Sequence, residues 1–395
     1  MISDDIVIVA ARRTPTGSLL GTLSSFTAPE LASFAHRAVL EDSNIPKEDL
    51  SEIITGCVLS AGIGQAPARQ AALKAGIPQH VGATTINKMC GSGMKAIMLG
   101  VDAIRTHTAS IVLAGGMESM SRAPFLLQGA RKGYRLGHQV VSDHMLLDGL
   151  EDAYEPGVLM GCFADRTAQH FSFSREAQDE YAKLSMTRAL HAQETHAFQA
   201  EITPIMRQER ESTIIIDKDE GPDAAKLTKL ARLKPSFSKD GTVTPGNSSS
   251  IADGAASLLL MRSEEASRRG IKPLARIIAH SSHAQAPEWF TTAPIGAIQS
   301  LLQKTGWTTH DVDLFEINEA FAVVAMAAIH TLELSPEKVN IYGGACALGH
   351  PIGASGARIV TTLVHALKRQ GKKRGIATLC IGGGEATAIA IEAYL

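Results

Sequence analysis

The chain has 395 residues, of which 45% are hydrophobic and 20% are charged. This length predicts two or three domains with well-filled cores. A formal net charge of −2 provides no basic surface that would gather nucleic acid or anionic lipid, so neither is expected as a partner. The five cysteines are scattered and include no C-x-x-C pair, which argues against a disulfide framework or a metal site and favours a reducing compartment.

The N-terminal segment "MISDDIVIVAARRTPTG" passes directly into a strand pattern. Such a start is typical of neither a signal peptide nor an Arg-rich transit peptide. No apolar run approaches the ~18 residues that a membrane span requires. We therefore expect a soluble, cytoplasmic protein with no membrane partner.

Two series of elements occur once in each half of the chain. Residues 30–56 read as an amphipathic helix, an acidic turn and an apolar strand, and residues 294–320 repeat that order. Residues 90–119 and 352–386 share a second series, namely a glycine turn, a helix, an apolar strand and a glycine pair. Strands that are apolar throughout, such as "IVLAGG" and "IATLCIGG", are covered on both faces. The sequence therefore predicts an α/β protein of two similar halves.

The middle of the chain does not share this plan. We place the first half at 1–119, with about 250–270 returning to it, an inserted loop domain at 120–249, and the second half at 271–395. The insertion contains a predicted helix at 174–197 and a Gly/Ser/Thr/Pro stretch at 241–250. We expect it to cover a site where equivalent loops of the two halves face each other.

Cys90 stands directly before a Gly-Ser-Gly turn and a run that predicts a helix. Unpaired N–H groups and the macrodipole at a helix N-terminus favour the thiolate. Gly91 and Gly93 carry no side chains, so we expect room for a bulky acyl donor and a backbone N–H at Cys90 that could meet an oxyanion. The alternative is a buried cysteine that packs as a small hydrophobic residue.

His350 lies in the glycine-rich loop "GGACALGHPIGASG", where the following proline favours an extended or turn conformation. An imidazole in such a loop could be the base that a cysteine nucleophile needs. A structural loop histidine is the alternative. The glycines match no phosphate-binding pattern such as G-x-G-x-x-G.

Two further candidates follow apolar strands of the second half. Cys380, in "LCIGGGEA", ends a buried strand at the edge where α/β folds place their chemistry. Asn318, in "EINEAFA", could fix a water or an oxyanion, or could cap a helix that begins near Glu319. All the candidates lie at strand-to-helix junctions, so we expect them to meet in one site between the halves.

Together these motifs resemble those of the thiolase family. The blocks "NKMCGSGMKA", "GTVTPGNSSSIADGAA", "EINEAFA", "NIYGGACALGHPIGASGARI" and "CIGGGEA" occur in the family's order. The resemblance implies the duplicated thiolase fold, a layered αβαβα core with an inserted loop domain. It is strongest to the acetyl-CoA C-acetyltransferases, which implies reversible ping-pong condensation of two acetyl-CoA to acetoacetyl-CoA and CoA. Coenzyme A thioesters would be the substrates, and no metal or other cofactor is implied.

The same resemblance assigns roles to individual residues. Cys90 would be the nucleophile that becomes acetylated and His350 its base. Cys380 would remove a proton from the methyl group of the second acetyl-CoA, and Asn318 would hold a water that, with His350, stabilises the enolate. Backbone N–H groups of Cys90 and Gly382 would form a second oxyanion hole. The implied substrate contacts are Met160, Phe237, Ser249 and Phe321.

Some positions depart from the short-chain pattern and leave alternatives open. Leu159, Ser250 and Ala252 stand where short-chain biosynthetic members tend to have His, Gly and Asn. A degradative 3-ketoacyl-CoA thiolase acting on longer acyl chains is therefore the main alternative. A β-ketoacyl synthase would use paired histidines or a His/Asn pair, against which "CIGGG" argues. A non-catalytic acyl-CoA-binding protein would be expected to lack at least one of the two cysteines or the histidine.

The segment 128–149 is too long and too mixed in character for a simple connector. We expect it to make contacts or to form a lid, the alternative being a mobile surface loop. The resemblance implies a homo-oligomer, namely a tetramer.

Overall fold

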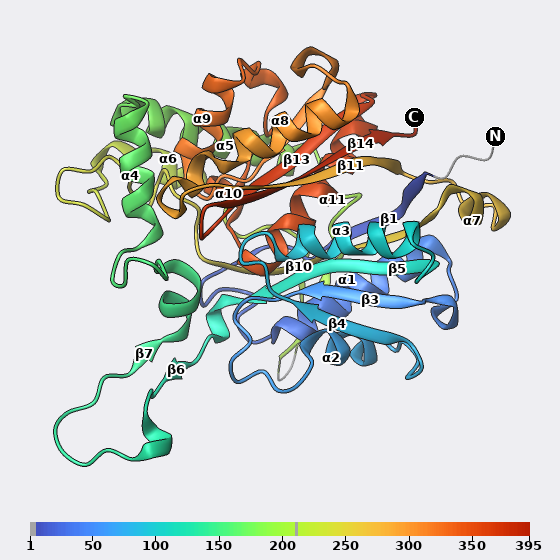
Figure 1. The fold of residues 1–395 in the computed structure, drawn as a ribbon, viewed down its shortest axis with the longest axis horizontal. Helices are drawn as coiled ribbons and strands as arrows, with labels where there is room; N and C mark the ends of the chain where they lie inside the picture. Colours follow the sequence, from blue (N-terminus) through green and yellow to red (C-terminus); the bar gives the residue numbers. More distant parts are fainter. Residues whose placement is uncertain (1–4, 210–211) are drawn as a thin grey trace.

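A computed structural model describes residues 5–209 and 212–395, so the first four residues of the N-terminal segment lie outside the described part. Two sets of strands lie one above the other, with helices between them and on both outer sides (Figure 1). The strands of the first half are β1 (Ile6–Arg13), β2 (Gly17–Ser18), β3 (Glu52–Gly56), β4 (Gly82–Ile86), β5 (Ile111–Ser119) and β10 (Ala252–Arg262). Those of the second half are β11 (Ala275–Ala284), β12 (Leu314–Ile317), β13 (Arg374–Ile381) and β14 (Glu385–Ala393).

Pairing between β1 and β11 joins the two sets. Among the described residues the strand order is β12-β13-β14-β11-β1-β10-β5-β3-β4, with β2 beside β10. β10 lies between β1 and β5 and is antiparallel to both. In β5 every residue is buried, as expected of an apolar strand covered on both faces.

Helices complete a five-layer arrangement. Helices α1 (Ala28–Ser43) and α2 (Pro67–Lys74) pack outside the first set of strands, and α8 (Ala293–Thr305) packs outside the second, followed by α9 (Ala322–Thr331). Helices α3 (Ser92–Arg105) and α11 (Ile352–Gln370) contact each other between the two sets (Figure 1). The predicted αβαβα layering is confirmed.

The predicted internal repeat corresponds to matching elements. Helix α1, a 3-10 turn at Lys47–Asp49 and β3 match α8, a 3-10 turn at Thr309–Asp311 and β12. In the second series, α3 and β5 match α11 and β13. Because the halves are alike, the N-termini of α3 and α11 meet at their junction.

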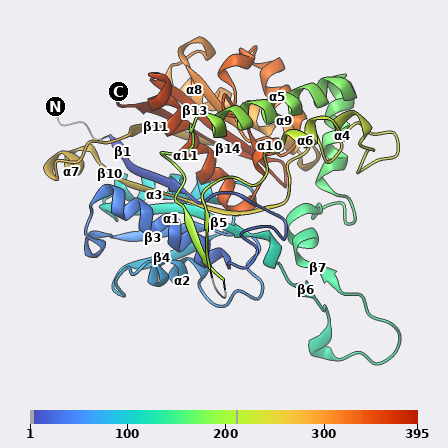
Figure 2. The same ribbon diagram turned by 180° about the vertical axis from the view of Figure 1, so that it is seen from behind.

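The inserted section contains short elements and one long arm. The predicted helix at 174–197 is observed as α5 (Arg175–Glu194), and residues 241–250 contain neither helix nor strand. The other elements are β6 (Phe125–Leu126), β7 (Ser142–Asp143), a π-helical turn (Leu146–Leu150), α4 (Met160–His170), β8 (Ile205–Gln208), β9 (Thr213–Ile216) and α6 (Ala224–Leu227). Residues between β6 and β7 form an arm that extends away from the body (Figures 1 and 2).

The short helices α7 (Ser263–Arg268) and α10 (Ala345–Leu348) complete the described structure. Within residues 5–209 and 212–395, none of the helices combines the length and the apolar character needed to cross a membrane.

Candidate active site

Cys90 lies in a tight turn between β4 and α3, directly before Gly91, the N-cap of the helix. The hydroxyl of Ser92 accepts a hydrogen bond from the Lys88 backbone N–H (2.8 Å) and donates one to the Met89 carbonyl (2.7 Å). Met89 has a positive φ of 49°, which few non-glycine residues adopt. The turn places Cys90 in the wall of a cavity of about 290 Å³.

The two glycines after Cys90 make room for protein rather than for ligand. A Cβ on Gly91 would lie 2.4 Å from Cδ1 of Ile381, and one on Gly93 would lie 2.8 Å from the backbone nitrogen of Ala357. Both contacts come from the second half of the chain. The expectation that these glycines admit a bulky acyl donor is therefore wrong, because they permit the close approach of the two halves.

The helix start does not give Cys90 a low pKa. Burial raises the pKa of its thiol to about 11, and backbone N–H groups of Gly382 and of Cys90 itself oppose this rise only in part. The charge of Glu118 raises the pKa further. The predicted preference for thiolate is thus outweighed by desolvation, and Cys90 needs a base to become a nucleophile.

His350 has the geometry of that base. Its Nδ1 lies 2.5 Å from the hydroxyl oxygen of Ser355, which donates to the Pro351 carbonyl at 3.0 Å. This pattern assigns the imidazole proton to Nδ1 and leaves the lone pair on Nε2. Nε2 is buried and has no hydrogen-bond partner among the described residues.

The pKa of His350 is lowered to about 3, first by burial and then by the charge of Arg358. The imidazole is therefore neutral at physiological pH and able to accept a proton.

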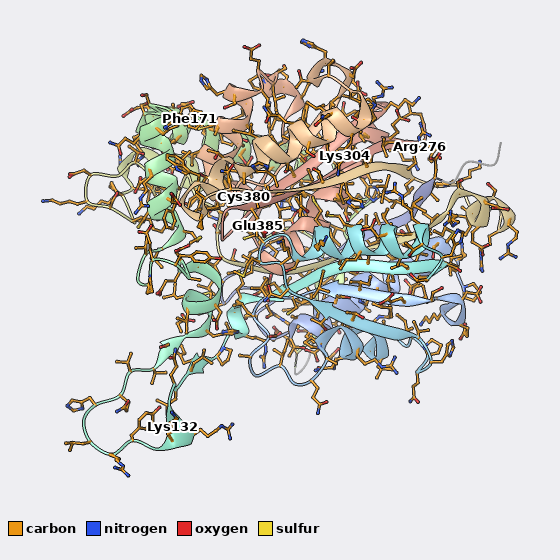
Figure 3. All side chains as sticks on the ribbon, viewed as in Figure 1. Lys132, Phe171, Arg276, Lys304, Cys380 and Glu385 are labelled. Atoms are coloured by element: carbon orange, nitrogen blue, oxygen red, sulfur yellow. The ribbon has the colours of Figure 1, made fainter. Side chains whose placement is uncertain are left out.

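Cys380 lies one residue before the end of β13, near the middle of the molecule, where the halves meet (Figure 3). It is fully buried. Burial raises the pKa of its thiol well above the ordinary value, and the charge of the Cys90 thiolate raises it further, which makes the two thiols electrostatic neighbours. An ion pair between Lys88 and Glu385 connects the loop before Cys90 to the strand after Cys380.

Asn318 follows β12 and is fully buried. Its Nδ2 lies 3.5 Å from Nδ1 of His350. Because Ser355 already accepts the proton of that imidazole nitrogen, the N–H groups of the amide stay available for a water or a substrate oxygen. The alternative role as a helix cap is wrong, since α9 begins at Ala322 with Phe321 at its N-cap.

The other predicted positions surround the cavity or its neighbour. The first cavity is lined by Cys90, His350, Gly382, Met160, Ser249 and Phe321. A second cavity of about 560 Å³ shares several of these residues and adds Phe237, Leu159 and Ser250. Asn318 and Cys380 are buried and absent from both linings. Among the described residues no cluster of His, Cys, Asp or Glu could hold a metal ion.

Sequence reasoning did not single out two groups that hold this site. Ser355 orients His350, and its place in the loop-to-helix motif, five residues after the histidine, was the available signal. Glu118 accepts hydrogen bonds from the backbone N–H groups of Val58 (3.0 Å), Leu59 (3.1 Å) and Gly353 (2.9 Å). The hydrogen bond from Gly353 joins the two halves. The available signal in the sequence was a carboxylate inside an otherwise apolar strand.

Enzymes that carry an acyl group on sulfur need a nucleophilic thiol, a base and donors for the oxyanion. The junction of the two halves brings such groups to one cavity. The fold and the site together define a cysteine-dependent acyltransferase.

Comparison with known proteins specifies the family. The thiolase N-terminal domain matches residues 6–264 and the thiolase C-terminal domain matches residues 271–393. The chain belongs to the thiolase family. This confirms the resemblance and sets aside the β-ketoacyl synthase alternative.

Individual relatives match over nearly the whole chain. "Acetyl-CoA acetyltransferase 2" of Arabidopsis thaliana is 49% identical over 392 residues, which cover 98% of this chain and 97% of the relative. "Acetyl-CoA acetyltransferase, cytosolic" of Mus musculus is 47% identical, covering 99% of this chain and 98% of its own length. The crystal structure of the Bacillus anthracis acetyl-CoA acetyltransferase superposes with a TM-score of 0.97 at 41% identity, covering 99% of each chain.

Proposed function

We propose that the protein is an acetyl-CoA C-acetyltransferase that condenses two acetyl-CoA to acetoacetyl-CoA and CoA, reversibly and through an acetyl-cysteine. The observation that carries this proposal is the position of Cys90, in the same cavity wall as the neutral base His350 and beside Cys380. The names of the relatives in Arabidopsis, mouse and Bacillus support acetyl-CoA as the substrate.

In the first half-reaction Cys90 attacks the thioester carbonyl of acetyl-CoA. Its proton passes to Nε2 of His350, and backbone N–H groups of Cys90 and Gly382 stabilise the oxyanion. Collapse of the tetrahedral intermediate breaks the bond to the CoA sulfur. The leaving thiolate takes a proton from the Cys380 thiol and departs as CoA, which leaves Cys380 as the thiolate and His350 as the imidazolium.

In the second half-reaction Cys380, as the thiolate, takes a proton from the methyl group of a second acetyl-CoA. Burial raises the pKa of this thiol, so its thiolate is a stronger base towards a carbon acid. A water held by Asn318, together with His350, stabilises the enolate, whose carbon attacks the acetyl group on Cys90. The released Cys90 thiolate recovers its proton from the His350 imidazolium, so the cycle ends with two thiols and a neutral imidazole. The two thiols and the imidazole supply every proton transfer, so the reaction uses no metal or organic cofactor.

Substrate contacts follow from the linings of the two cavities. Met160, Ser249 and Phe321 line both of them, and Phe237 packs edge-to-face on Phe321 with ring centroids 5.9 Å apart. These residues would contact the acyl group and the pantetheine arm.

A degradative thiolase for longer acyl chains is the second candidate. The apolar residues Leu146, Leu150, Leu159 and Ile251 in the larger cavity favour it. Steady-state thiolysis of 3-ketoacyl-CoA substrates of increasing chain length decides between the two. The proposal predicts the highest kcat/KM for acetoacetyl-CoA, and a maximum at longer chains would replace it with the degradative assignment.

The low pKa of His350 predicts an unusual pH profile for acetylation. Because its pKa is about 3, the base is lost only when the pH falls towards that value, and Cys90 with a pKa of about 11 stays a thiol at neutral pH. We expect the acetylation rate to be nearly constant from about pH 5 to about pH 9. Acetyl-pantetheine is the donor of choice, because it lacks titrating phosphates. An acidic limb centred near 6.5, the ordinary pKa of histidine, would contradict this.

The protein assembles as a homo-oligomer, and a tetramer is the expected state. The arm between β6 and β7 exposes apolar side chains, including Leu136 at 94% and Val140 at 80%, and carries Lys132 far from the body (Figure 3). β4 forms a partly exposed edge of the sheet that could pair with a second copy. Multi-angle light scattering at micromolar concentration should give the mass of four chains, and a monomer would reject the assembly.

A cytoplasmic location is supported by the five free cysteines and by the mouse relative's name.

A further inference from the structure

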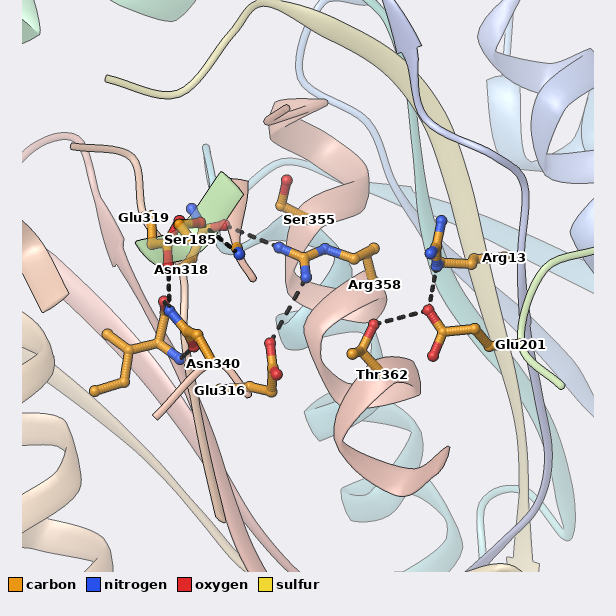
Figure 4. Close-up of polar contacts among 12 residues, drawn as sticks. Arg13, Ser185, Glu201, Glu316, Asn318, Glu319, Asn340, Ser355, Arg358 and Thr362 are labelled. Carbon is orange, nitrogen blue, oxygen red and sulfur yellow. Dashed lines mark hydrogen bonds and ion pairs between the residues drawn. The ribbon is translucent and has the colours of Figure 1, made fainter. Parts of the chain in front are cut away.

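One face of α11 carries three polar side chains, two of which contact residues of the active site. Ser355, Arg358 and Thr362 follow one another at spacings of three and four residues, so they lie on the same side of the helix (Figure 4). Ser355 contacts His350. Arg358 contacts Asn318. Thr362 contacts Glu201, which lies away from the cavity.

Arg358 determines which way the Asn318 amide faces. One NH2 group of the guanidinium lies 3.5 Å from Oδ1 of Asn318. Arginine has donors only and keeps its charge, so the amide must turn its oxygen towards it. Nδ2 is then directed towards His350, at 3.5 Å from Nδ1. Oδ1 and Nδ2 are nearly equal in size, so without this cation the amide of Asn318 would have no preferred orientation.

Burial of the Arg358 guanidinium costs desolvation free energy that its contacts with other residues do not offset. The residue is 3% exposed, and its NH1 group has no hydrogen-bond partner among the described residues. The nearest carboxylate is that of Glu316, whose Oε2 lies 3.7 Å from NH1, at ion-pair rather than hydrogen-bond distance. A buried ion pair with such loose geometry repays little of its desolvation cost. Stability alone therefore does not explain the arginine.

We propose that Arg358 is a positioning residue that fixes the Asn318 amide with its N–H groups turned to the enolate and polarises that amide. Hydrogen bonds in series strengthen one another, so a cation at Oδ1 makes Nδ2–H a better donor. The contact between Arg358 and Oδ1 of Asn318, at 3.5 Å, is at the long end of the hydrogen-bond range, so the field of the cation matters as much as a formed bond. This inference rests on the proposed function, because the amide orientation matters only where an enolate is stabilised.

The test separates the two half-reactions in the full-length enzyme. Arg358→Met keeps most of the side-chain volume and removes the charge. Exchange of acetyl methyl protons with solvent, and condensation, should fall about 10- to 100-fold, less than the ~100- to 1,000-fold that loss of an oxyanion donor costs. Acetylation of Cys90 by acetyl-CoA should change little at neutral pH, because Asn318 takes no part in it and because burial, the larger cause of the low pKa of His350, remains when the charge of Arg358 is removed.

A double-mutant cycle then shows whether Arg358 acts through Asn318. In an Asn318→Ala background, Arg358→Met should cause no further loss of proton exchange. Thr362→Val, one turn further along the same face, is the matched control and should leave the ratio of exchange to acetylation unchanged. If Arg358→Met does not fold, Arg358→Lys, which keeps the charge but not the planar fork, takes its place in the cycle with a smaller loss expected.

Additive losses in the cycle, or equal losses in acetylation and exchange, would overturn the inference while leaving the proposed function standing. A wild-type enzyme that is not acetylated at Cys90 would overturn both.

Discussion

Replacement of Cys90 by alanine is expected to abolish acetyl-enzyme formation and to reduce condensation and thiolysis by at least ~10⁴-fold. The alanine variant has no atom that can carry the acetyl group between the two half-reactions. Positioning by the cavity cannot replace a covalent intermediate. CoA release from acetyl-CoA and the mass of the intact protein measure the effect.

Cys162 provides the matched control for this variant. Like Cys90 it is a half-buried free cysteine, and it lies in α4. Cys162→Ala should be acetylated as the wild type is. A Cys90→Ala protein that still acquires an acetyl group in the cavity would show that the nucleophile is a different residue.

Cys380→Ser is expected to separate the two half-reactions. Serine is nearly isosteric, but its hydroxyl hardly ionises, whereas a thiol has an ordinary pKa of about 8.5. Acetylation of Cys90 should persist with some loss. Condensation, and exchange of acetyl methyl protons with solvent, should fall by about 10²- to 10⁴-fold, because the carbon acid has lost its base.

Methyl-proton exchange is measured by NMR in deuterated buffer, beside the acetylation rate of the same preparation. A mild and equal loss in both would mean that Cys380 only lines the site. A severe and equal loss would contradict the division of labour between the two cysteines.

The fold was predictable from the sequence because its signals are periodic. Local patterns predict the apolar strands, such as β5 and β13, and the helix–turn–strand series. Because the chain is duplicated, each of these patterns occurs twice and each half supports the prediction for the other. The positions of Cys90, His350, Cys380 and Asn318 at ends of such elements were also predictable, since topology brings strand and helix ends to one edge.

The electrostatics of the site could not be predicted in the same way. A helix start favours thiolate, but the pKa of Cys90 is set by burial between two halves that are distant in sequence. In the sequence Gly91 and Gly93 indicate open space, whereas in the structure Ile381 and Ala357 pack against them. Secondary-structure propensity and residue spacing describe one segment of the chain. The pKa of Cys90 and the space beside the two glycines depend on which distant segments pack against that one.

The supporting residues escaped prediction for a related reason. Arginine is an ordinary residue in helices, so the sequence gives no signal at Arg358. Only its burial beside Asn318, which the structure shows, sets it apart from other helical arginines. The alternative role of Asn318 as a helix cap is wrong because α9 begins later, at Ala322, which leaves the amide free to face His350.

The covalent mechanism is tested most directly by peptide mass spectrometry of the wild-type protein after brief mixing with acetyl-CoA and acid quenching. The proposed mechanism predicts one acetyl group per chain, on the peptide that contains Cys90, and its loss when CoA is added before the quench. Acetylation at Cys380 or at any other residue in place of Cys90, or no acetylation under conditions in which acetoacetyl-CoA forms, would contradict it.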